Sequence, residues 1–386
     1  MAHTVLLAVI YLAFISLGLP DGVLGVAWPA MRGGFGEPLE AAGLITLVIT
    51  ACSAVSGFAS GAVLQRLGTG PVVVISGFLT GLALLGFAAA PSFLWILLLA
   101  VPLGLGAGSV DAGLNHFVAR HYSSRHMNWL HACWGVGASI GPLIMGAALA
   151  KNGGWADAYR SIASLQLMLA VVFLLTLALW KREPELAQGL EPDGSAGPRS
   201  GPAPIWAGWL APSLYLMYAT VEVGTGLWAA SILVEQRGLT PRDAAWWVSC
   251  FYAAIMSGRF ALGLIAVRLG NRRLVHGGLA LALIGAALFA IPGLPSALTL
   301  AGLVLLGLGA APVYPSLMHE TTRRFEATLA RRVVGRQVAF ASLGAATGPA
   351  ALGLLGAHWG SNAIMPMLVL VLLMLWLLVW RLDQVS

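Results

Sequence analysis

The sequence predicts an all-α membrane protein with twelve transmembrane helices in two related six-helix bundles. Three observations predict this class: a low content of charged residues, twelve long apolar stretches, and an internal repeat. Of the 386 residues, 59% are hydrophobic and only 9% are charged, whereas an ordinary soluble domain carries about 25% charged residues. A water-facing surface cannot be built from this composition, so much of the apolar surface must face lipid.

The apolar stretches each have the length of about 20 residues that is needed to cross the hydrocarbon of a bilayer. They cover approximately residues 4–30, 40–64, 71–90, 93–119, 129–150, 159–181, 205–234, 242–267, 273–292, 296–320, 333–357 and 361–381. An even number of spans places both termini on the same side of the membrane. Of the 21 basic residues, 15 then lie on the side of the termini, five lie on the other side, and Arg259 lies at membrane depth. The positive-inside rule therefore predicts cytoplasmic termini in a bacterial-type inner membrane.

The two halves of the chain are related by an offset near 202 residues. Residues 103–116 of the fourth span align with residues 306–319 of the tenth, so that Asp111 corresponds to Tyr314. The first and seventh spans each carry one acid at the same offset, Asp21 and Glu222. Such parallel repeats are typical of transporters in which two bundles rock about a site near the middle of the membrane.

A segment rich in Glu, Pro, Gly and Ser separates the two halves and can form neither a core nor a span. We predict that residues 182–204 form a cytoplasmic linker. The N-terminal bundle would then comprise residues 1–181, and the C-terminal bundle residues 205–386.

These features resemble the major facilitator superfamily over nearly the whole chain. The loop after the second span in that family is usually Gly-x-x-x-Asp-Arg-x-Gly-Arg-Arg. Here the two copies have Gln65-Arg66-Leu-Gly68 and Val267-Arg268-Leu-Gly270, so both lack the family aspartate. Within the family, the chain resembles the fucose and glucose permease group, whose similar members move hexoses with protons or sodium. Four segments carry this resemblance: Gly18-Leu-Pro-Asp21-Gly-Val-Leu-Gly25, Gly106-Ala-Gly-Ser-Val-Asp111-Ala-Gly-Leu-Asn115, Leu130-His131-Ala-Cys-Trp134-Gly-Val-Gly137 and Glu222-Val-Gly-Thr-Gly-Leu-Trp228.

An ionisable side chain at the centre of a spanning helix costs at least about 2.5 to 3.5 kcal/mol, so it normally faces a bundle interior or a water-filled cavity. Asp21 is such a residue. Trp28 lies seven residues later, so a regular helix would present the carboxylate and the indole on one face. That pair is suited to binding a sugar hydroxyl and the apolar face of a sugar ring. The alternative is a kinked helix, because Pro20 and Pro29 flank the segment.

The second candidate acid is Asp111, with Asn115 four residues later on the same helical face. We expect both to line the cavity, because the repeat partner Tyr314 also combines a ring with a hydroxyl group. The alternative is a contact between two helices in which a protonated Asp111 binds its neighbour.

The third candidate acid, Glu222, lies four residues after Tyr218 and forms a polar aromatic face with it. The segment Gly224-Thr225-Gly226 predicts that this helix is interrupted at cavity depth. The expected contribution of Trp228 to the site depends on that interruption.

Arg259 requires an anion at membrane depth, and Glu222 is the expected partner; the alternative is a structural charge pair or backbone capping inside the C-terminal half. His131, Trp134 and Gln337 lie in the first turns of the fifth and eleventh spans. They are candidates for the inner mouth of the cavity, with packing or interfacial anchoring as the alternative.

The expected function is secondary active uptake of a hexose or a similar small polar solute, coupled to a cation. A carboxylate in a poorly hydrated cavity favours its protonated form, so it can carry a proton, although sodium is also possible. An efflux antiporter for hydrophobic or cationic compounds is the alternative. The sequence shows no nucleophile-base pair and no metal cluster, so no enzyme, metal or cofactor is expected. We expect a monomer in the lipid bilayer that does not bind nucleic acid.

Overall fold

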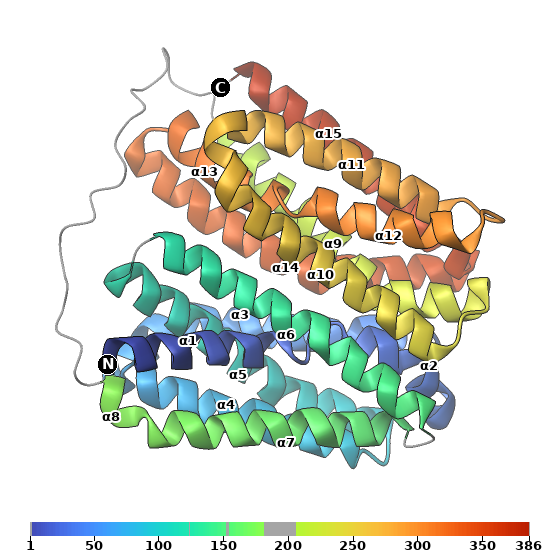
Figure 1. Cartoon of the computed structure of the whole chain (residues 1–386). Coiled ribbons are helices and arrows are strands. Elements are labelled where there is room, and N and C mark those ends of the chain that lie inside the picture. The colour runs from blue at the N-terminus through green and yellow to red at the C-terminus, as the bar shows by residue number, and fades with distance from the viewer. Residues whose placement is uncertain (1, 123, 152–153, 181–205, 386) are drawn as a thin grey trace.

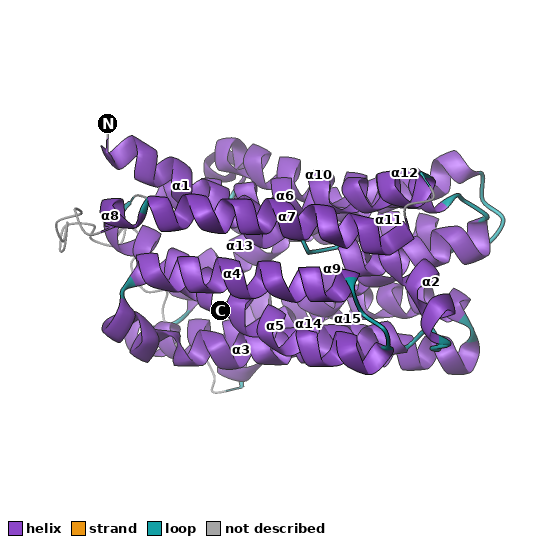
Figure 2. Ribbon diagram, turned by 90° about the horizontal axis from the view of Figure 1, so that it is seen from below, coloured by secondary structure: helices purple, strands orange, loops and turns teal. Residues whose placement is uncertain are grey.

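The computed structural model describes residues 2–122, 124–151, 154–180 and 206–385. Within these ranges the ordered elements are helices, no strand occurs, and the short loops lie at the two ends of the helices (Figure 2). The first half contains α1 (Ala2–Gly18), α2 (Val23–Phe35), α3 (Ala41–Leu67), α4 (Thr69–Ala88), α5 (Phe93–His121), α6 (Ser124–Ala150), α7 (Gly154–Leu175) and α8 (Leu177–Trp180). The second half contains α9 (Ala207–Arg237), α10 (Pro241–Leu269), α11 (Asn271–Ala290), α12 (Ser296–Ala310), α13 (Val313–Arg324), α14 (Ala327–Trp359), the short 3-10 helix η1 (Ser361–Ala363) and α15 (Ile364–Val385).

The length and apolarity of these helices agree with an all-α membrane fold. In the described part of the chain, 11 helical segments are long and apolar enough to cross a membrane. The further long helix, α10, packs against α6, α9 and α12 and lies among them. Large apolar side chains such as Phe58, Leu175 and Leu377 remain exposed on the outside of the molecule. Exposed apolar surface of this kind is stable only against lipid.

The two halves lie side by side, and both described chain ends are at the same end of the molecule (Figure 1). Contacts between the halves are made by α6 with α10, by α3 with α14, and by α2 with α9. The predicted linker 182–204 lies outside the described residues, so the domain boundary stays a prediction.

Two of the predicted spans are interrupted well inside their length, while the sixth is interrupted only near its end, at Thr176 between α7 and α8. The first span ends as α1 at Gly18 and resumes as α2 at Val23, because Pro20 has no N–H to donate and Gly22 has a φ of 73°. The tenth span is divided into α12 and α13 at Ala311-Pro312. Asp21 therefore lies within a helix break, as in the alternative in which the first span is a kinked helix. A position within the break is compatible with a functional role.

The interruption expected at Gly224-Thr225-Gly226 is absent, because α9 is continuous from Ala207 to Arg237. The glycines there allow close packing instead. A Cβ at Gly226 would overlap the hydroxyl group of Tyr252 in α10, and a Cβ at Gly224 would lie 2.7 Å from Leu352 in α14. The prediction of a broken seventh span was therefore wrong.

The halves are packed closely on the side of Asp21 that faces away from the termini. A Cβ at Gly25 in α2 would lie 2.5 Å from the carbonyl oxygen of Gly226 in α9, so the two backbones touch. Farther along α2, the Arg32 guanidinium lies 2.6 Å from the Glu235 carboxylate of α9. This end of the molecule is therefore closed between the halves.

This contact predicts that Gly25→Val shifts the protein away from the closed arrangement. Disulfide cross-linking between Arg32→Cys and Glu235→Cys, with Cys52, Cys133 and Cys250 replaced by Ala, should fall by about tenfold or more, since a bias of about 1.4 kcal/mol changes a population ratio tenfold. Gly57→Val in α3 is the control, because nothing lies within 4 Å of a Cβ at that glycine. Equal cross-linking in all three backgrounds would contradict the assignment of this contact.

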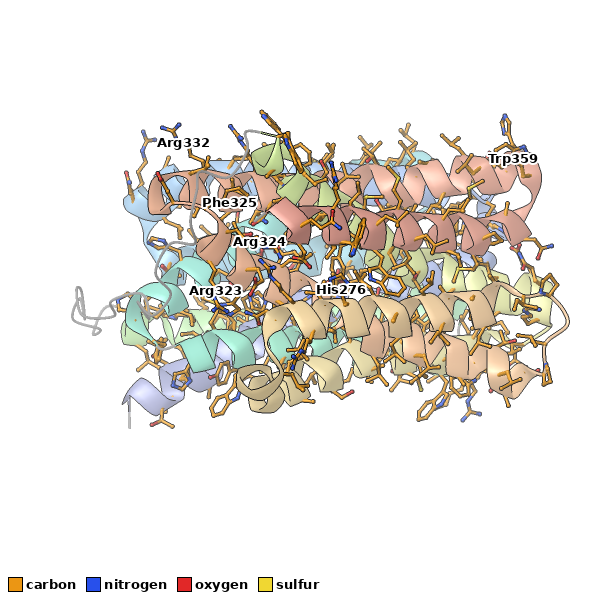
Figure 3. The ribbon with its side chains drawn as sticks, turned by 90° about the horizontal axis from the view of Figure 1, so that it is seen from above. His276, Arg323, Arg324, Phe325, Arg332 and Trp359 are labelled. Atoms are coloured by element: carbon orange, nitrogen blue, oxygen red, sulfur yellow. The ribbon has the colours of Figure 1, made fainter. Side chains whose placement is uncertain are left out.

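At the end that carries the termini, a charge cluster joins three helices of the second half. Arg272 in α11 lies 3.2 Å from Glu320 in α13, and Arg324 in α13 pairs with Asp383 in α15. Figure 3 labels Arg324 and His276, which lie on neighbouring elements of this cluster. Arg272, two residues after Gly270 of the second loop copy, therefore binds acids from α13 and α15 in place of the missing motif aspartate.

Candidate functional site

A group of polar and aromatic side chains gathers where the break after α1 meets α6, α9 and α10. Its first member is Asp21, whose exposed carboxyl group accepts a hydrogen bond of 2.7 Å from the indole Nε1 of Trp134 in α6. The break permits this contact, because the residues around Asp21 leave the regular path of α1. The structure therefore places Trp134 directly against Asp21.

Arg259 in α10 connects the two halves at this point. Its guanidinium carbon lies 5.6 Å from the centroid of the Trp134 ring, within the range of a cation–π contact. Its Nη2 atom lies 3.4 Å from Oε1 of Glu222 and 3.5 Å from the hydroxyl of Tyr218, both in α9. The structure thus brings together the predicted pair of Glu222 and Arg259, and adds the indole from the other half.

Three tyrosines surround the break between α12 and α13. The Tyr218 hydroxyl donates a hydrogen bond of 3.1 Å to the carbonyl oxygen of Ala310, the last residue of α12. The Tyr215 hydroxyl donates a hydrogen bond of 3.0 Å to the carbonyl oxygen of Tyr314, and the two rings meet edge to face. These bonds hold the interrupted tenth span against α9 and place Tyr314 beside Tyr218.

Asp111 and Asn115 lie on α5, and their hydrogen bonds connect them to each other. The Asn115 amide donates bonds of 2.9 Å to both the carboxylate and the backbone carbonyl of Asp111. Asp111 is exposed and interacts electrostatically with Asp21 and Tyr314. Among the described side chains, the site therefore combines three carboxyl groups with the guanidinium of Arg259.

Three of the predicted residues, Trp28, Trp228 and Gln337, lie away from this group, whereas a fourth, His131, interacts electrostatically with Arg259. Trp28 is fully buried, and its Nε1 donates to the carbonyl oxygen of Leu39. Trp228 is also fully buried, and its Nε1 donates to the carbonyl oxygen of Pro349. The Gln337 amide donates to Thr321 in the second half, and His131 packs edge to face on Phe14. The expected common face of Asp21 and Trp28 is not formed, because the helix is interrupted directly after Asp21.

Tyr252 is a central residue that the sequence reasoning missed. Its ring lies edge to face on Trp134, with the ring centroids 6.2 Å apart, and it packs between Gly22 and Gly226. The available signal was its position seven residues before Arg259, which places both on one face of α10.

Two helical halves with a charged and aromatic site at their interface define a secondary transporter. The sequence profile described as Major Facilitator Superfamily matches residues 10–227 and 210–385, so the chain belongs to this superfamily. A search of curated proteins found no match to the chain.

Solved transporters have the same fold. The chain is similar to a bacterial homologue of the human lysosomal transporter Spinster in an inward-facing and occupied conformation, with 15% identity, coverage of 100% of this chain and 97% of that chain, and a TM-score of 0.81. For the unoccupied form of that homologue the identity and both coverages are the same and the TM-score is 0.78. A variant of the nucleoside transporter NupG gives 12% identity, coverage of 97% and 98%, and a TM-score of 0.75.

Proposed function

We propose that the protein takes up a hexose or a similar small polar solute together with a cation, most simply a proton. The observation that carries this proposal is the group formed by Asp21, Trp134, Arg259 and Glu222, which contacts both halves of the molecule. Carboxylates and a guanidinium supply hydrogen bonds to hydroxyl groups, while the rings of Trp134 and Tyr252 supply apolar faces. A sugar presents both kinds of surface. The resemblance to the fucose and glucose permease group supports the same substrate class.

Proton coupling follows from the position of Asp21. Its carboxyl group is held by Trp134 beside the contact between the halves, so its charge changes the energy of closing them. Excluding water costs less free energy for a protonated carboxyl group than for a charged carboxylate. Protonation together with solute binding would therefore allow the halves to rock, and deprotonation after opening to the cytoplasm would release both.

One observation favours a second candidate function, the export of organic cations in exchange for protons. The site holds three carboxyl groups that interact electrostatically, of which only Glu222 pairs with Arg259, and Trp134, Tyr218, Tyr252 and Tyr314 provide aromatic rings, as a site for an organic cation requires. The first function is preferred because Asn115 and the tyrosine hydroxyl groups add hydrogen-bonding capacity that a hydrophobic cation does not use.

Transport assays in proteoliposomes test both functions. A panel of radiolabelled hexoses, polyols and nucleosides is supplied with an inward pH gradient, an inward sodium gradient, or neither. We expect accumulation of at least one hexose or polyol under the pH gradient and only equilibration without a gradient. Export of a cationic dye without accumulation of any solute of the panel would replace the proposal with the antiporter.

A further inference from the structure

A cavity of about 70 Å³ lies inside the N-terminal half, behind the site and apart from the contact between the halves. Its lining residues all belong to α1, α3, α4, α5, α7 and the break after α1. Asp21 is one of them, and its carboxyl group accepts the hydrogen bond from Trp134 in the site at the interface, so this residue borders both spaces. We call this cavity the N-half chamber.

Three buried polar side chains form a chain of hydrogen bonds along the wall of the N-half chamber. The Ser16 hydroxyl donates to Oε1 of Gln166 at 2.7 Å, and Nε2 of Gln166 donates to the Thr80 hydroxyl at 3.2 Å. Thr80 in turn donates to the carbonyl oxygen of Ser76 at 3.0 Å. Each of the three side chains is at most 4% exposed. The Ser16 oxygen and the second N–H of Gln166 keep capacity for a further partner.

The size and polarity of the N-half chamber are those of a site for water. A cavity needs at least about 10 to 15 Å³ of space, and two to four polar partners, to hold a water molecule. The chamber exceeds this minimum volume, and Asp21, Ser16, Thr80 and Gln166 supply the polar partners. A dry cavity would leave the remaining hydrogen-bonding capacity of the buried Ser16 and Gln166 side chains unused.

The N-half chamber extends from Asp21 toward the end of the molecule that carries the termini. Its lining includes Thr80 and Val73 on α4, and Gln166 and Phe173 on α7, in each case seven residues apart. Seven residues of helix span about 10 Å at a rise of 1.5 Å per residue. The polar groups lie at the Asp21 end, and Val73, Val110 and Phe173 form an apolar end.

We propose that water in the N-half chamber exchanges a proton with Asp21 from the side away from the solute site. The inference rests on the proposed proton coupling and adds a route to it. A hydronium ion in the chamber transfers its proton to a carboxylate oxygen of Asp21 and becomes water, and the reverse transfer returns the proton. No other reactant is required. A solute bound against Trp134 and Arg259 would then leave the exchange of this proton unobstructed.

The decisive variant is Ala107→Leu, which fills the chamber from α5 without changing any group of the solute site. We expect its pH-driven accumulation to fall by about tenfold or more, equivalent to about 1.4 kcal/mol of lost driving force. Counterflow, in which labelled solute exchanges for unlabelled solute without a gradient, should stay within about twofold of the wild type, a change of less than about 0.5 kcal/mol. Ala59→Leu on an exposed position of α3 is the matched control and should leave both activities unchanged.

A second variant keeps the test decisive if Ala107→Leu loses both activities through misfolding. Thr80→Val preserves the shape of the side chain but removes the hydroxyl group that binds Gln166, and the same separation of accumulation from counterflow is expected. Accumulation equal to that of the wild type in either variant, or driven by sodium alone, would overturn the water route. A wild-type protein that accumulates no solute under any gradient would instead overturn the proposed function together with this inference.

Discussion

Asp21→Asn is expected to abolish pH-driven accumulation while leaving counterflow in place. Asn keeps the shape of the side chain and still accepts the hydrogen bond from Trp134, but it cannot bind or release a proton. A membrane potential of 100 mV supplies about 2.3 kcal/mol per charge, which corresponds to an accumulation ratio of about 50. The variant should reduce that ratio to about 1, because solute movement is no longer linked to a charge. The measurement is solute uptake in proteoliposomes at an imposed potential and pH gradient.

The control for Asp21→Asn is Asp157→Asn, the same exchange at an exposed carboxyl group paired with Arg160 in α7. An exposed ion pair contributes little to stability, so this variant should transport like the wild type. Undiminished accumulation in Asp21→Asn would remove Asp21 from coupling. The remaining carboxyl groups of the site, Asp111 and Glu222, would then be the residues to test.

Arg259→Gln should reduce both accumulation and counterflow by about 10- to 100-fold. Removing one partner of a fully buried ion pair costs about 3 to 5 kcal/mol. The cost here is lower, because the side chains of Arg259 and Glu222 are 19% and 13% exposed. The substitution also removes the cation from the Trp134 ring. Arg259→Lys should be nearly as impaired, since one ammonium group cannot reproduce the planar, multiply bonded guanidinium.

The double variant Arg259→Gln with Glu222→Gln separates charge pairing from other effects. It should recover part of the counterflow lost in Arg259→Gln, because no unpaired charge remains at the interface. Arg242→Gln, an exposed arginine at the other end of α10, is the control and should transport normally. A double variant no better than Arg259→Gln alone would contradict a role for the charge pair and leave the contact with Trp134 as the function of Arg259.

Part of the candidate site could be predicted from the sequence, and part could be found only in the structure. Asp21, Glu222 and Arg259 were identified because an ionisable group in an apolar span is costly and therefore has a partner or a cavity. That rule concerns single residues and holds in any packing arrangement. Tyr252 was missed because a tyrosine in an apolar span has no such cost and becomes informative only beside Trp134. Ser16, Thr80 and Gln166 were missed because each belongs to a different helix.

Trp28 and Trp228 illustrate the limit of helical periodicity. Both were placed in the site by their spacing from an acid or by an expected interruption, and both donate their indole N–H to backbone carbonyl groups inside their own halves. Spacing predicts a common face only within an uninterrupted helix. Glycine residues were present near both the real and the rejected interruptions, whereas a proline lies only at the real ones, as Pro20 and Pro312.

Hydropathy, the internal repeat and the cost of a charge in lipid depend on composition and spacing along one chain, so they were sufficient to predict the membrane fold, the two helical halves and the acids in apolar spans. The folded structure was needed to show that Trp134 binds Asp21, that Arg259 joins the two halves and that a chamber with polar groups lies behind Asp21. These contacts depend on the rotation of each helix about its axis and on the points at which α1 and α12 end. Both are set by packing among helices that are distant in the sequence.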